Sequence, residues 1–399
     1  MRRRKKTCIA KGLFLIGLLG LLGCGSPSSD YTDTLQQNTE IQDVLAEKNG
    51  EQTDNGLNYE NSMELEYAEN FTVDYYEGGY KLLTTTIDGA KFLVVPEGKA
   101  APENLEEDVV VLQQPMKDIY LVASAVMDMF SELDGLDAIT FSGQKEENWY
   151  IESAKEAMAK GEIFYAGKYN KPDYELIVSK NCTLAIENRM ISHSPEVVEK
   201  LEDFGIPVMI EYSSYEPHPL GRVEWIKFFG ALLGEEEKAE QIFQQQTAIL
   251  DEVTADEKTD KTVAFFFVTS NGLVQVRQSS DYVPKMIELA GGNYIFENLG
   301  DSETKRSTVN MQVEEFYNSA KDADFLIYNS SIDGGVSNQE ELLEKCEFLA
   351  DFKAVKEGNV WCTTNDMYQQ SLSIGYLIED IHSMLLGKED TMRYLFPLE

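Results

Sequence analysis

Short apolar runs alternate with stretches of helical period through the middle of the chain. LDAITFSG (136–143), TLAIEN (183–188) and IPVMIEY (206–212) predict buried strands. Between the last two, SPEVVEKLEDFG (194–205) predicts a helix that ends at Gly205. Strands that alternate with helices in this way indicate a parallel sheet covered by helices.

Upstream of these elements the pattern changes to strands joined by tight turns. FTVDYYEGGYKLLTTTIDGAKFLVVPEG (71–98) has runs of β-formers around Gly78-Gly79 and Asp88-Gly89, which predicts hairpins. DVVVLQQP (108–115) predicts a buried strand. The following MKDIYLVASAVMDMFSEL (116–133) predicts an amphipathic helix, whose apolar side comprises Ile119, Val122, Val126, Met129 and Leu133.

The second half of the chain repeats the alternation of strands and helices without repeating the sequence of the first half. KTVAFFFVTS (261–270), ADFLIYNSS (323–331) and GNVWCTTN (358–365) predict strands. Helices are predicted around them, over 281–292, 311–320, 338–352 and 371–387. Each half of the chain is therefore expected to fold into a lobe of its own.

The segment between the two halves, HPLGRVEWIKFFGALLGEEEKAEQIFQQQTAIL (218–250), is strongly helical. Its first part has a single apolar face, made of Trp225, Phe228, Phe229, Leu232 and Leu233. Gly234 predicts a stop, and the three glutamates after it favour a new helix N-terminus. A second helix of about 20 residues would span roughly 30 Å. The predicted fold class is therefore α/β, with two Rossmann-like lobes of mostly parallel sheet bridged by a single long helix.

The first 24 residues have the order of a secretion signal. MRRRKKTCIAK is basic, and GLFLIGLLGLLG is an apolar run of twelve residues, too short for a permanent membrane span. Leu21-Leu22-Gly23-Cys24 resembles the bacterial lipobox, in which the cysteine becomes the lipid-modified first residue of the mature chain. We therefore expect a lipid anchor at Cys24 that holds the protein on the extracytoplasmic face of the bacterial cell membrane.

Charge and composition indicate how the chain divides after the signal. Loss of residues 1–23 removes six of the 34 Lys and Arg and none of the 70 acids, which leaves a formal charge of −42. So acidic a chain argues against nucleic-acid binding and against electrostatic adhesion to anionic lipid, which leaves the lipid at Cys24 as the expected membrane contact. The predicted divisions are a signal peptide (1–23), a disordered tether (24–63), an N-terminal lobe (64–234), the bridging helix (235–257) and a C-terminal lobe (258–399).

Three cysteines remain once the signal and the lipidated residue are set aside: Cys182, Cys346 and Cys362. Their odd number and wide spacing fit neither a disulfide framework nor a CxxC metal site. Cys182 and Cys362 lie in or beside apolar strands, so we expect both to be buried. No cofactor is expected.

Five segments together resemble the substrate-binding lipoproteins of ABC importers, in particular the rigid-spine class that carries ferric siderophores, haem or cobalamin. The segments are HPLGRVEWIKFFGALLGEEEKAEQIF, SDYVPKMIELAGGNYIF, PDYELIVSKNCTLAIEN, VEEFYNSAKDADFLIYN and FKAVKEGNVWCT. The resemblance covers about residues 105–399. It implies a monomeric, lipid-anchored binding protein that captures an iron chelate, haem or cobalamin and delivers it to a permease dimer with its ATPase.

The same resemblance implies one exposed acidic residue on each lobe that docks into an arginine pocket of a permease subunit. Carried over to this sequence, the two are Glu175 and Glu314, with Glu315 an alternative to the second. Complementary charge at such positions sets register and encounter rate more than affinity. A helix also favours carboxylates in its first turn for its own stability, so the position alone leaves both roles open.

The ligand is expected in the cleft between the lobes, at loops that follow the carboxyl ends of parallel strands. Arg277 is the candidate for binding an anionic ligand, since a guanidinium can bind two oxygens at once. The alternative is a surface arginine that pairs with one of the many acids of the chain. Arg189, Tyr215 and Tyr368 are further candidates in these loops. Trp149 and Tyr150, which lie outside these loops, could supply flat apolar walls together with Tyr215. Arg222 is expected to be structural. Basic residues are scarce in the loops, which argues against a highly anionic siderophore held by an arginine cluster.

Three other functions stay open beside the importer. A free Zn, Mn or Fe site needs several histidines, but only His193, His218 and His382 occur. An enzyme would need a catalytic motif, and no GxSxG, HExxH, P-loop or GxGxxG is present. A lipoprotein sensor or scavenger could use the same fold without a permease.

Overall fold

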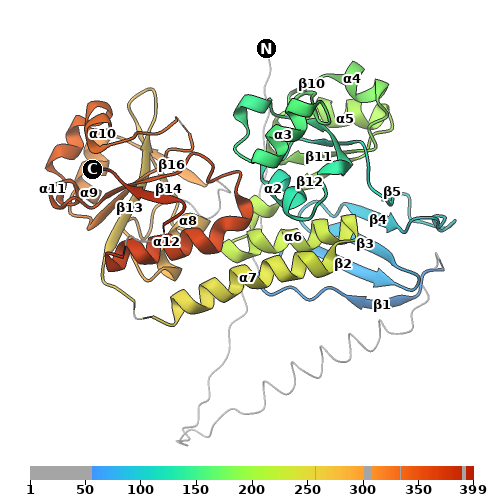
Figure 1. The fold of residues 1–399 in the computed structure, drawn as a ribbon, viewed down its shortest axis with the longest axis horizontal. Coiled ribbons are helices and arrows are strands. Elements are labelled where there is room, and N and C mark those ends of the chain that lie inside the picture. Colours follow the sequence, from blue (N-terminus) through green and yellow to red (C-terminus); the bar gives the residue numbers. More distant parts are fainter. Residues whose placement is uncertain (1–55, 257, 301–306, 333, 389–391) are drawn as a thin grey trace, which may run out of the picture. The chain divides into compact units, whose positions relative to one another are not determined.

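The computed structural model describes residues 56–399 except 257, 301–306, 333 and 389–391. Cys24, the signal peptide and most of the predicted tether therefore lie outside the described residues. The described chain is an α/β protein with two lobes and one additional sheet (Figure 1). No helix within the described part is long and apolar enough to cross a membrane.

The first lobe is built on a five-stranded parallel sheet of order β12-β11-β6-β7-β8. The strands are β6 (Ile119–Leu121), β7 (Ile139–Ser142), β8 (Phe164–Tyr165), β11 (Leu184–Asn188) and β12 (Val208–Glu211). Its helices are α2 (Ser124–Glu132), α3 (Glu152–Lys160), α4 (Tyr174–Ser179) and α5 (Pro195–Asp203). A small hairpin, β9 (Gly167–Lys168) and β10 (Lys171–Pro172), precedes α4.

The helix predicted over 116–133 is wrong in its first half. Ile119–Leu121 forms β6 in the middle of the sheet, and α2 begins only at Ser124. Residues 119–122 are buried on every side, so the apolar spacing that predicted a helix is equally the continuous apolar run of a buried parallel strand. This correction supplies the strand between β7 and β11 that the first lobe needs.

The second lobe has a seven-stranded mixed sheet of order β16-β14-β13-β17-β18-β19, with β15 also paired to β13. The strands are β13 (Thr262–Val268), β14 (Val274–Arg277), β15 (Asn293–Tyr294), β16 (Thr308–Met311), β17 (Phe325–Tyr328), β18 (Val360–Thr363) and β19 (Leu395–Pro397). The strands β13, β15, β17 and β18 are parallel. The helices are α8 (Tyr282–Leu289), α9 (Val313–Ala320), α10 (Gln339–Lys345), α11 (Lys353–Glu357) and α12 (Ile374–Leu386).

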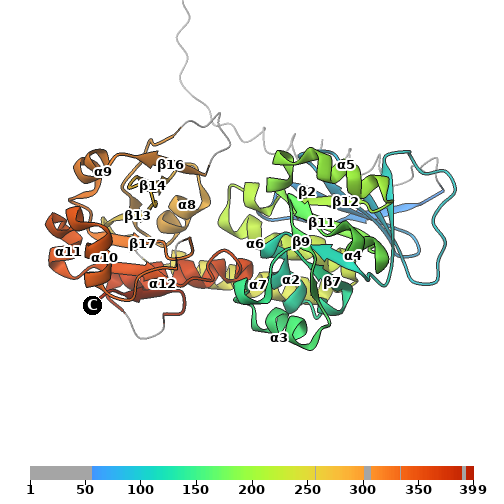
Figure 2. The same ribbon diagram turned by 90° about the horizontal axis from the view of Figure 1, so that it is seen from above.

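The junction at Gly234 is confirmed. Helix α6 (Pro219–Leu233) ends at Gly234, which has a φ of 87°, and α7 (Glu236–Thr254) begins two residues later. A left-handed backbone favours glycine because it lacks a Cβ. Helix α7 packs against both α6 and α12 of the second lobe, which lie one after the other along it (Figures 1 and 2), so it bridges the lobes as predicted. Helix α6 is buried almost all round rather than along one face, and the buried residues include Glu224 and Lys227.

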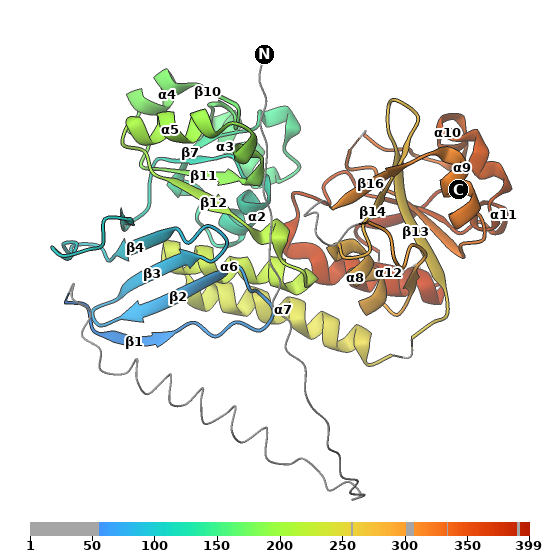
Figure 3. The ribbon, with the colours of Figure 1, turned by 180° about the vertical axis from the view of Figure 1, so that it is seen from behind.

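An additional sheet of order β1-β2-β3-β4-β5 precedes the first lobe and lies beside α6 and α7 (Figure 3). Its strands are β1 (Tyr59–Ser62), β2 (Phe71–Tyr76), β3 (Tyr80–Thr85), β4 (Lys91–Val95) and β5 (Val109–Gln113). The predicted hairpins at Gly78-Gly79 and Asp88-Gly89 are confirmed. Two expectations are wrong here: β1 lies inside the predicted tether, and β5 is a partly exposed edge strand rather than a buried one.

Two carboxylates fasten this sheet to α6. Glu224 accepts the backbone N–H groups of Glu66, Tyr67 and Ala68, each at 2.8 Å. Glu216, just before α6, accepts those of Glu69 at 2.9 Å and Asn70 at 3.0 Å, and the Trp225 Nε1–H at 2.8 Å. The segment 66–70 thus satisfies its backbone donors on side chains of α6 and its N-terminal loop rather than within a sheet.

The far end of α6 is held from the same sheet. Lys81 of β3 donates to the Ala231 carbonyl at 3.1 Å, and Gln114 donates to the Leu232 carbonyl at 3.1 Å. The last carbonyls of a helix have no partner within it, so cationic and amide donors stabilise them. The main hydrophobic core runs without a break through both lobes and α6, and Cys182, Cys346 and Cys362 are all buried.

Candidate functional site

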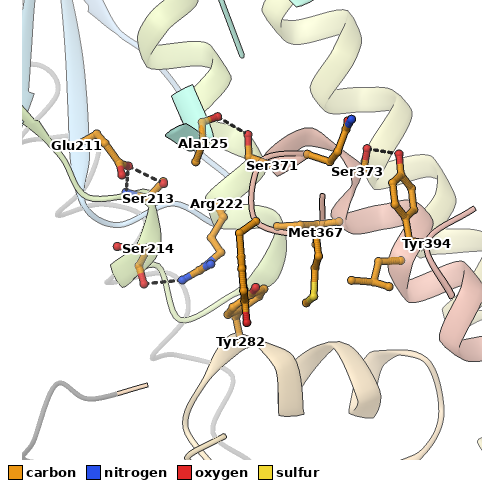
Figure 4. Close-up of a pocket in the computed structure, with 14 residues that line it drawn as sticks. Ala125, Glu211, Ser213, Ser214, Arg222, Tyr282, Met367, Ser371, Ser373 and Tyr394 are labelled. Atoms are coloured by element: carbon orange, nitrogen blue, oxygen red, sulfur yellow. Dashed lines mark hydrogen bonds between the residues drawn. The ribbon is translucent and has the colours of Figure 1, made fainter. Parts of the chain in front are cut away.

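A cavity of about 200 Å³ lies where the two lobes meet α6 (Figure 4). The first lobe and α6 contribute Ala125, Glu211, Ser213, Ser214 and Arg222. The second lobe contributes Tyr282, Met367, Tyr368, Gln370, Ser371, Ser373, Ile374, Leu377 and Tyr394. A partly apolar cavity with a few convergent polar groups has the character of a small-molecule site.

The polar groups of the first lobe gather at the carboxyl end of β12. Glu211 ends that strand, and its carboxylate accepts the Ser213 N–H at 3.0 Å and the Ser213 Oγ–H at 2.6 Å. Burial raises the pKa of Glu211, while the hydrogen bonds from Ser213 and the charge of Arg222 oppose that shift. Arg222, in the first turn of α6, donates to the Ser214 carbonyl at 2.6 Å.

The second lobe supplies aromatic walls. The Arg222 guanidinium lies 3.6 Å from the centre of the Tyr282 ring, which is a close cation–π contact across the two lobes. Tyr368 follows β18, and its hydroxyl accepts the Asn329 Nδ2–H at 2.8 Å and an N–H of Arg277. Tyr368 is therefore held by two donors of its own lobe.

Arg277 does not line the cavity. It is buried behind Tyr368, its Nη1 lies 3.6 Å from Asp281 Oδ2, and its Nη2 donates to the Tyr368 hydroxyl. Its charge is thus already balanced by a neighbouring carboxylate of its own lobe. The arrangement suits a residue that positions Tyr368 better than one that grips a ligand directly.

Residues 369–372, after β18, form a strap that joins the second lobe to the first. Gln369 accepts the Tyr150 N–H and donates to the Asn148 carbonyl, both at 2.8 Å. Ser371 donates to the Ala125 carbonyl at 2.7 Å, and the Leu372 N–H donates to Asp128 Oδ2 at 2.9 Å. Burial raises the pKa of Asp128 to about 7, although the Leu372 hydrogen bond opposes the shift. The strap (369–372) lies at one wall of the cavity, because Ser371 lines it.

A second cavity lies within the first lobe, at the carboxyl ends of β6, β7 and β11. Its lining is rich in donors: Gln144, Lys145, Asn148, Tyr165, Lys168, Tyr169 and Asn188, with Val122, Ser124, Gly143 and Glu147 completing it. Lys145 is 3.3 Å from Glu147. This cavity belongs to the same sheet edge that open α/β proteins use for ligands.

The remaining predicted ligand residues lie outside both cavities. Trp149 is 2% exposed in the core, where its Nε1–H donates to Ser142 Oγ at 3.2 Å. Tyr150 is 47% exposed, and its backbone, not its ring, contacts the strap. The Arg189 guanidinium lies 4.5 Å from the centre of the Tyr215 ring. Of the six predicted ligand residues, Tyr368 alone lines a cavity described here.

Glu175 and Glu314 are both exposed and lie in the first turns of α4 and α9, one in each lobe. Glu315 beside the second is exposed as well. Each position leaves the carboxylate free to reach a partner surface.

The sequence interpretation missed Arg222, Glu211 and Tyr282 as cavity residues. Arg222 was assigned to structure because it opens a helix, and Glu211 and Tyr282 stand at the edges of apolar segments. One signal was available: Glu211 and Arg222 flank the loop that contains Tyr215, a predicted ligand residue. The contact between Arg222 and Tyr282 joins residues 60 positions apart, which no local pattern predicts.

Glu187 is a buried acid whose carboxyl group has no hydrogen-bond partner among the described residues. It is fully buried at the end of β11. Burial raises its pKa to about 8. The folded protein therefore keeps a proton on Glu187 that the unfolded chain has already lost above about pH 4.5.

This difference makes a pH-dependent prediction. Since the folded state binds the extra proton, the contribution of Glu187 to the free energy of unfolding falls as pH rises from about 4.5 to about 8. We expect Glu187→Gln to gain stability relative to the wild type between pH 5 and pH 8, by roughly 1 kcal/mol per pH unit. Urea unfolding of the wild type and of Glu187→Gln at pH 5 and at pH 8 measures this change in relative stability. Glu199→Gln, at an exposed carboxyl on α5, is the control, and a constant difference between Glu187→Gln and wild type would contradict the prediction.

The described residues contain no group of three or more His, Cys, Asp and Glu side chains arranged to hold a metal ion. His218 accepts the Leu220 N–H at the start of α6, and His382 contacts Asp256 and the Ala290 carbonyl. Both rings therefore have structural partners.

A family model described as periplasmic binding protein matches residues 119–367. An uncharacterized lipoprotein of Methanocaldococcus jannaschii is 29% identical over 405 residues, which cover 97% of this chain and 98% of the relative. A second uncharacterized lipoprotein of that organism is 26% identical over 334 residues, covering 77% of this chain and 78% of the relative. The additional sheet precedes the matched family segment, but it lies within the region shared with the first relative.

Solved structures share the fold at low sequence identity. A periplasmic haem-binding protein of Vibrio cholerae has a TM-score of 0.54 at 16% identity, covering 68% of this chain and 98% of its own. An Fe³⁺-hydroxamate transport protein of Saccharomonospora viridis has a TM-score of 0.52 at 17% identity, covering 68% and 93%. A molybdate-binding protein of Haemophilus influenzae has a TM-score of 0.54 at 12% identity, covering 68% and 87%.

Proposed function

The chain belongs to the periplasmic binding protein family, and on that premise we propose that it is the extracytoplasmic solute-binding protein of an ABC importer. It captures an iron chelate or similar metal-organic ligand in the cavity between its lobes and delivers it to a permease dimer with its ATPase. The structural neighbours that bind haem, Fe³⁺-hydroxamate and molybdate support a metal-containing cargo.

The observation that carries this proposal is the composition of the cavity. Both lobes line it, and α6 forms part of its wall through Arg222. A solute held there touches two rigid bodies at once, so its binding depends on the position of one lobe relative to the other. Helix α7 is one continuous helix between the lobes, with no internal break that could act as a hinge, which favours a small closure over a wide hinge motion.

Attachment to the membrane is part of the same proposal. A lipid on Cys24 would hold the folded part outside the membrane, and the two archaeal relatives that bear the name lipoprotein support this. The protein acts as a monomer that docks through Glu175 on one lobe and Glu314 on the other. The segment between Cys24 and β1 then gives the reach that docking requires.

A ligand screen tests the proposal. Ferric siderophores, haemin, cobalamin and molybdate are added to the purified protein, and the melting temperature is followed. A ligand that binds the folded state stabilises it by mass action, by about 2.7 kcal/mol at a hundredfold excess over Kd. We expect at least one metal-organic ligand to raise the melting temperature. If none does so at millimolar concentration, the cargo class is wrong.

A further inference from the structure

The loop 212–216 carries part of the wall of the cavity between the lobes. It follows β12, and Ser213–Tyr215 form a short 3₁₀ turn within it. Ser213 and Ser214 line the cavity (Figure 4), and the Ser214 carbonyl accepts the hydrogen bond from Arg222. The position of this loop therefore affects the shape of that wall.

The first residue of the loop is held by the additional sheet. Asp88, in the turn between β3 and β4, accepts the hydrogen bond of the Tyr212 hydroxyl at its Oδ2, at 3.0 Å. Its Oδ1 accepts the Thr85 hydroxyl and the Ala90 N–H of the same turn, so the carboxylate is itself fixed. Tyr212 is 8% exposed, and its burial and the charge of Asp88 raise its pKa, which keeps the proton on the hydroxyl.

The last residue of the loop is held by the same sheet. Glu216, 2% exposed, accepts the backbone N–H groups of Glu69 at 2.9 Å and of Asn70 at 3.0 Å, just before β2. Thr86, beside Asp88, donates its N–H to the Asn70 carbonyl and its hydroxyl to the Glu69 carbonyl, both at 3.0 Å. The contacts at the two ends of the loop thus come from one connected part of the additional sheet.

Hydrogen bonds inside the loop give it a compact shape. The Tyr215 N–H donates to the Tyr212 carbonyl at 2.8 Å, and the Glu216 N–H donates to the Ser213 carbonyl at 3.1 Å. Bonds of this kind fix the shape of a turn, but its orientation depends on contacts with other elements. The hydrogen bonds to Asp88 and to residues 69–70 are contacts with another element, and they lie at the two ends of the loop.

We propose that the additional sheet is part of the binding machinery: it holds both ends of the loop 212–216, through Asp88 and residues 69–70, and so positions the cavity wall that binds the cargo. Asp88 and Tyr212 are positioning residues, since neither lines the cavity. A wall that is already ordered loses less conformational freedom when a solute binds, which favours affinity. This inference rests on the proposed function, and it gives a role to a part of the chain that precedes the matched family segment 119–367.

Removal of one hydroxyl tests the inference. Tyr212→Phe keeps the ring and loses only the hydrogen bond to Asp88. We expect amide protons of residues 213–216 to exchange about fivefold faster in Tyr212→Phe and in Asp88→Ala, because local opening no longer breaks that bond. Titrations with ferric desferrioxamine B and with haemin measure affinity, and each chelate that the wild type binds should bind both variants about three- to tenfold more weakly.

Two further variants separate this hydrogen bond from other effects of the substitutions. Asp88→Asn keeps a group that can hydrogen-bond the Tyr212 hydroxyl, so it should restore most of the exchange protection and of the affinity. Tyr212→Phe combined with Asp88→Ala should lose no more affinity than Asp88→Ala alone, since both substitutions remove the same contact.

Asp74→Ala is the matched control. It removes a carboxylate of β2 in the same sheet, where Asp74 accepts the Ser62 hydroxyl and not a group of the loop. It should leave exchange at 213–216 and chelate affinity unchanged, even if it lowers the melting temperature. Tyr212→Phe carries the test if Asp88→Ala does not fold.

Unchanged exchange at 213–216 in Tyr212→Phe overturns the inference, and so does faster exchange with unchanged chelate affinity. Equal losses in Asp74→Ala would also overturn it, because they would trace the effect to the stability of the sheet. A wild type that binds neither chelate contradicts the proposed cargo, and the exchange result then decides alone whether the sheet holds the loop.

Discussion

Replacing Glu224 by alanine is expected to lower the free energy of unfolding by about 3–5 kcal/mol. Glu224 is fully buried in α6, and its two oxygens accept three backbone N–H groups at 2.8 Å. Its Oε1 also lies 3.2 Å from the Lys227 Nζ. Alanine would leave the buried Ala68 N–H without an acceptor, and the loss of a buried partner costs the full desolvation of the group left behind.

Denaturant unfolding measures this loss, and hydrogen exchange locates it. The amide protons of Glu66, Tyr67 and Ala68 should exchange faster in Glu224→Ala, since they lose their acceptors. Glu252→Ala, at an exposed carboxylate of α7, should cost less than about 0.5 kcal/mol. A change below about 1 kcal/mol in Glu224→Ala, with unchanged exchange at residues 66–68, would show that the additional sheet does not depend on this carboxylate.

Reversing the charge at Glu175 and Glu314 together is expected to abolish uptake while ligand affinity stays within about twofold of the wild type. Both carboxylates are exposed on separate lobes and neither lines the cavity, so lysines there leave the site intact. A like charge placed against a basic docking pocket costs several kcal/mol, which removes productive encounters. Uptake of radiolabelled chelate by cells and titration of the purified variant give the two readouts.

The matched control places the same reversal on two other helices. Glu196 in α5 and Glu340 in α10 are also exposed first-turn glutamates, one in each lobe. Glu196→Lys with Glu340→Lys changes the net charge equally, so it should keep most of the uptake. Normal uptake by the Glu175 and Glu314 double variant would contradict docking through them, and a third variant with Glu315→Lys would test the neighbouring position.

The order of the elements was largely predictable, because strands buried in parallel sheets are continuous apolar runs and several of the helices, such as α3, α6, α11 and α12, end at glycines. Gly234 illustrates this: a single residue that favours a left-handed backbone predicts where α6 ends. The segment 116–133 was not predictable in the same way, since IYLVA fits a buried strand and an apolar helix face equally well.

The packing of the additional sheet and the content of the cavity could not be predicted from local patterns. Glu224 and Lys227 are residue types that normally occupy the solvent-exposed face of a helix. Both are buried here because the segment 66–70 and α7 supply their partners. Trp149 and Arg277 have the chemistry of ligand residues, but the first is used in the core and the second supports Tyr368. Residue type therefore indicates candidates, but only tertiary contacts distinguish a residue that lines the cavity from one that holds a lining residue in place.

Titration of the best ligand from the chelate screen into wild type and Ala125→Trp tests the central claim most directly. Ala125 lines the cavity between the lobes, so an indole there should fill it without touching Glu175 or Glu314. We predict saturable one-to-one binding by the wild type and a loss of on the order of 100-fold or more in a folded Ala125→Trp protein. Equal affinity in the two proteins would contradict capture in this cavity.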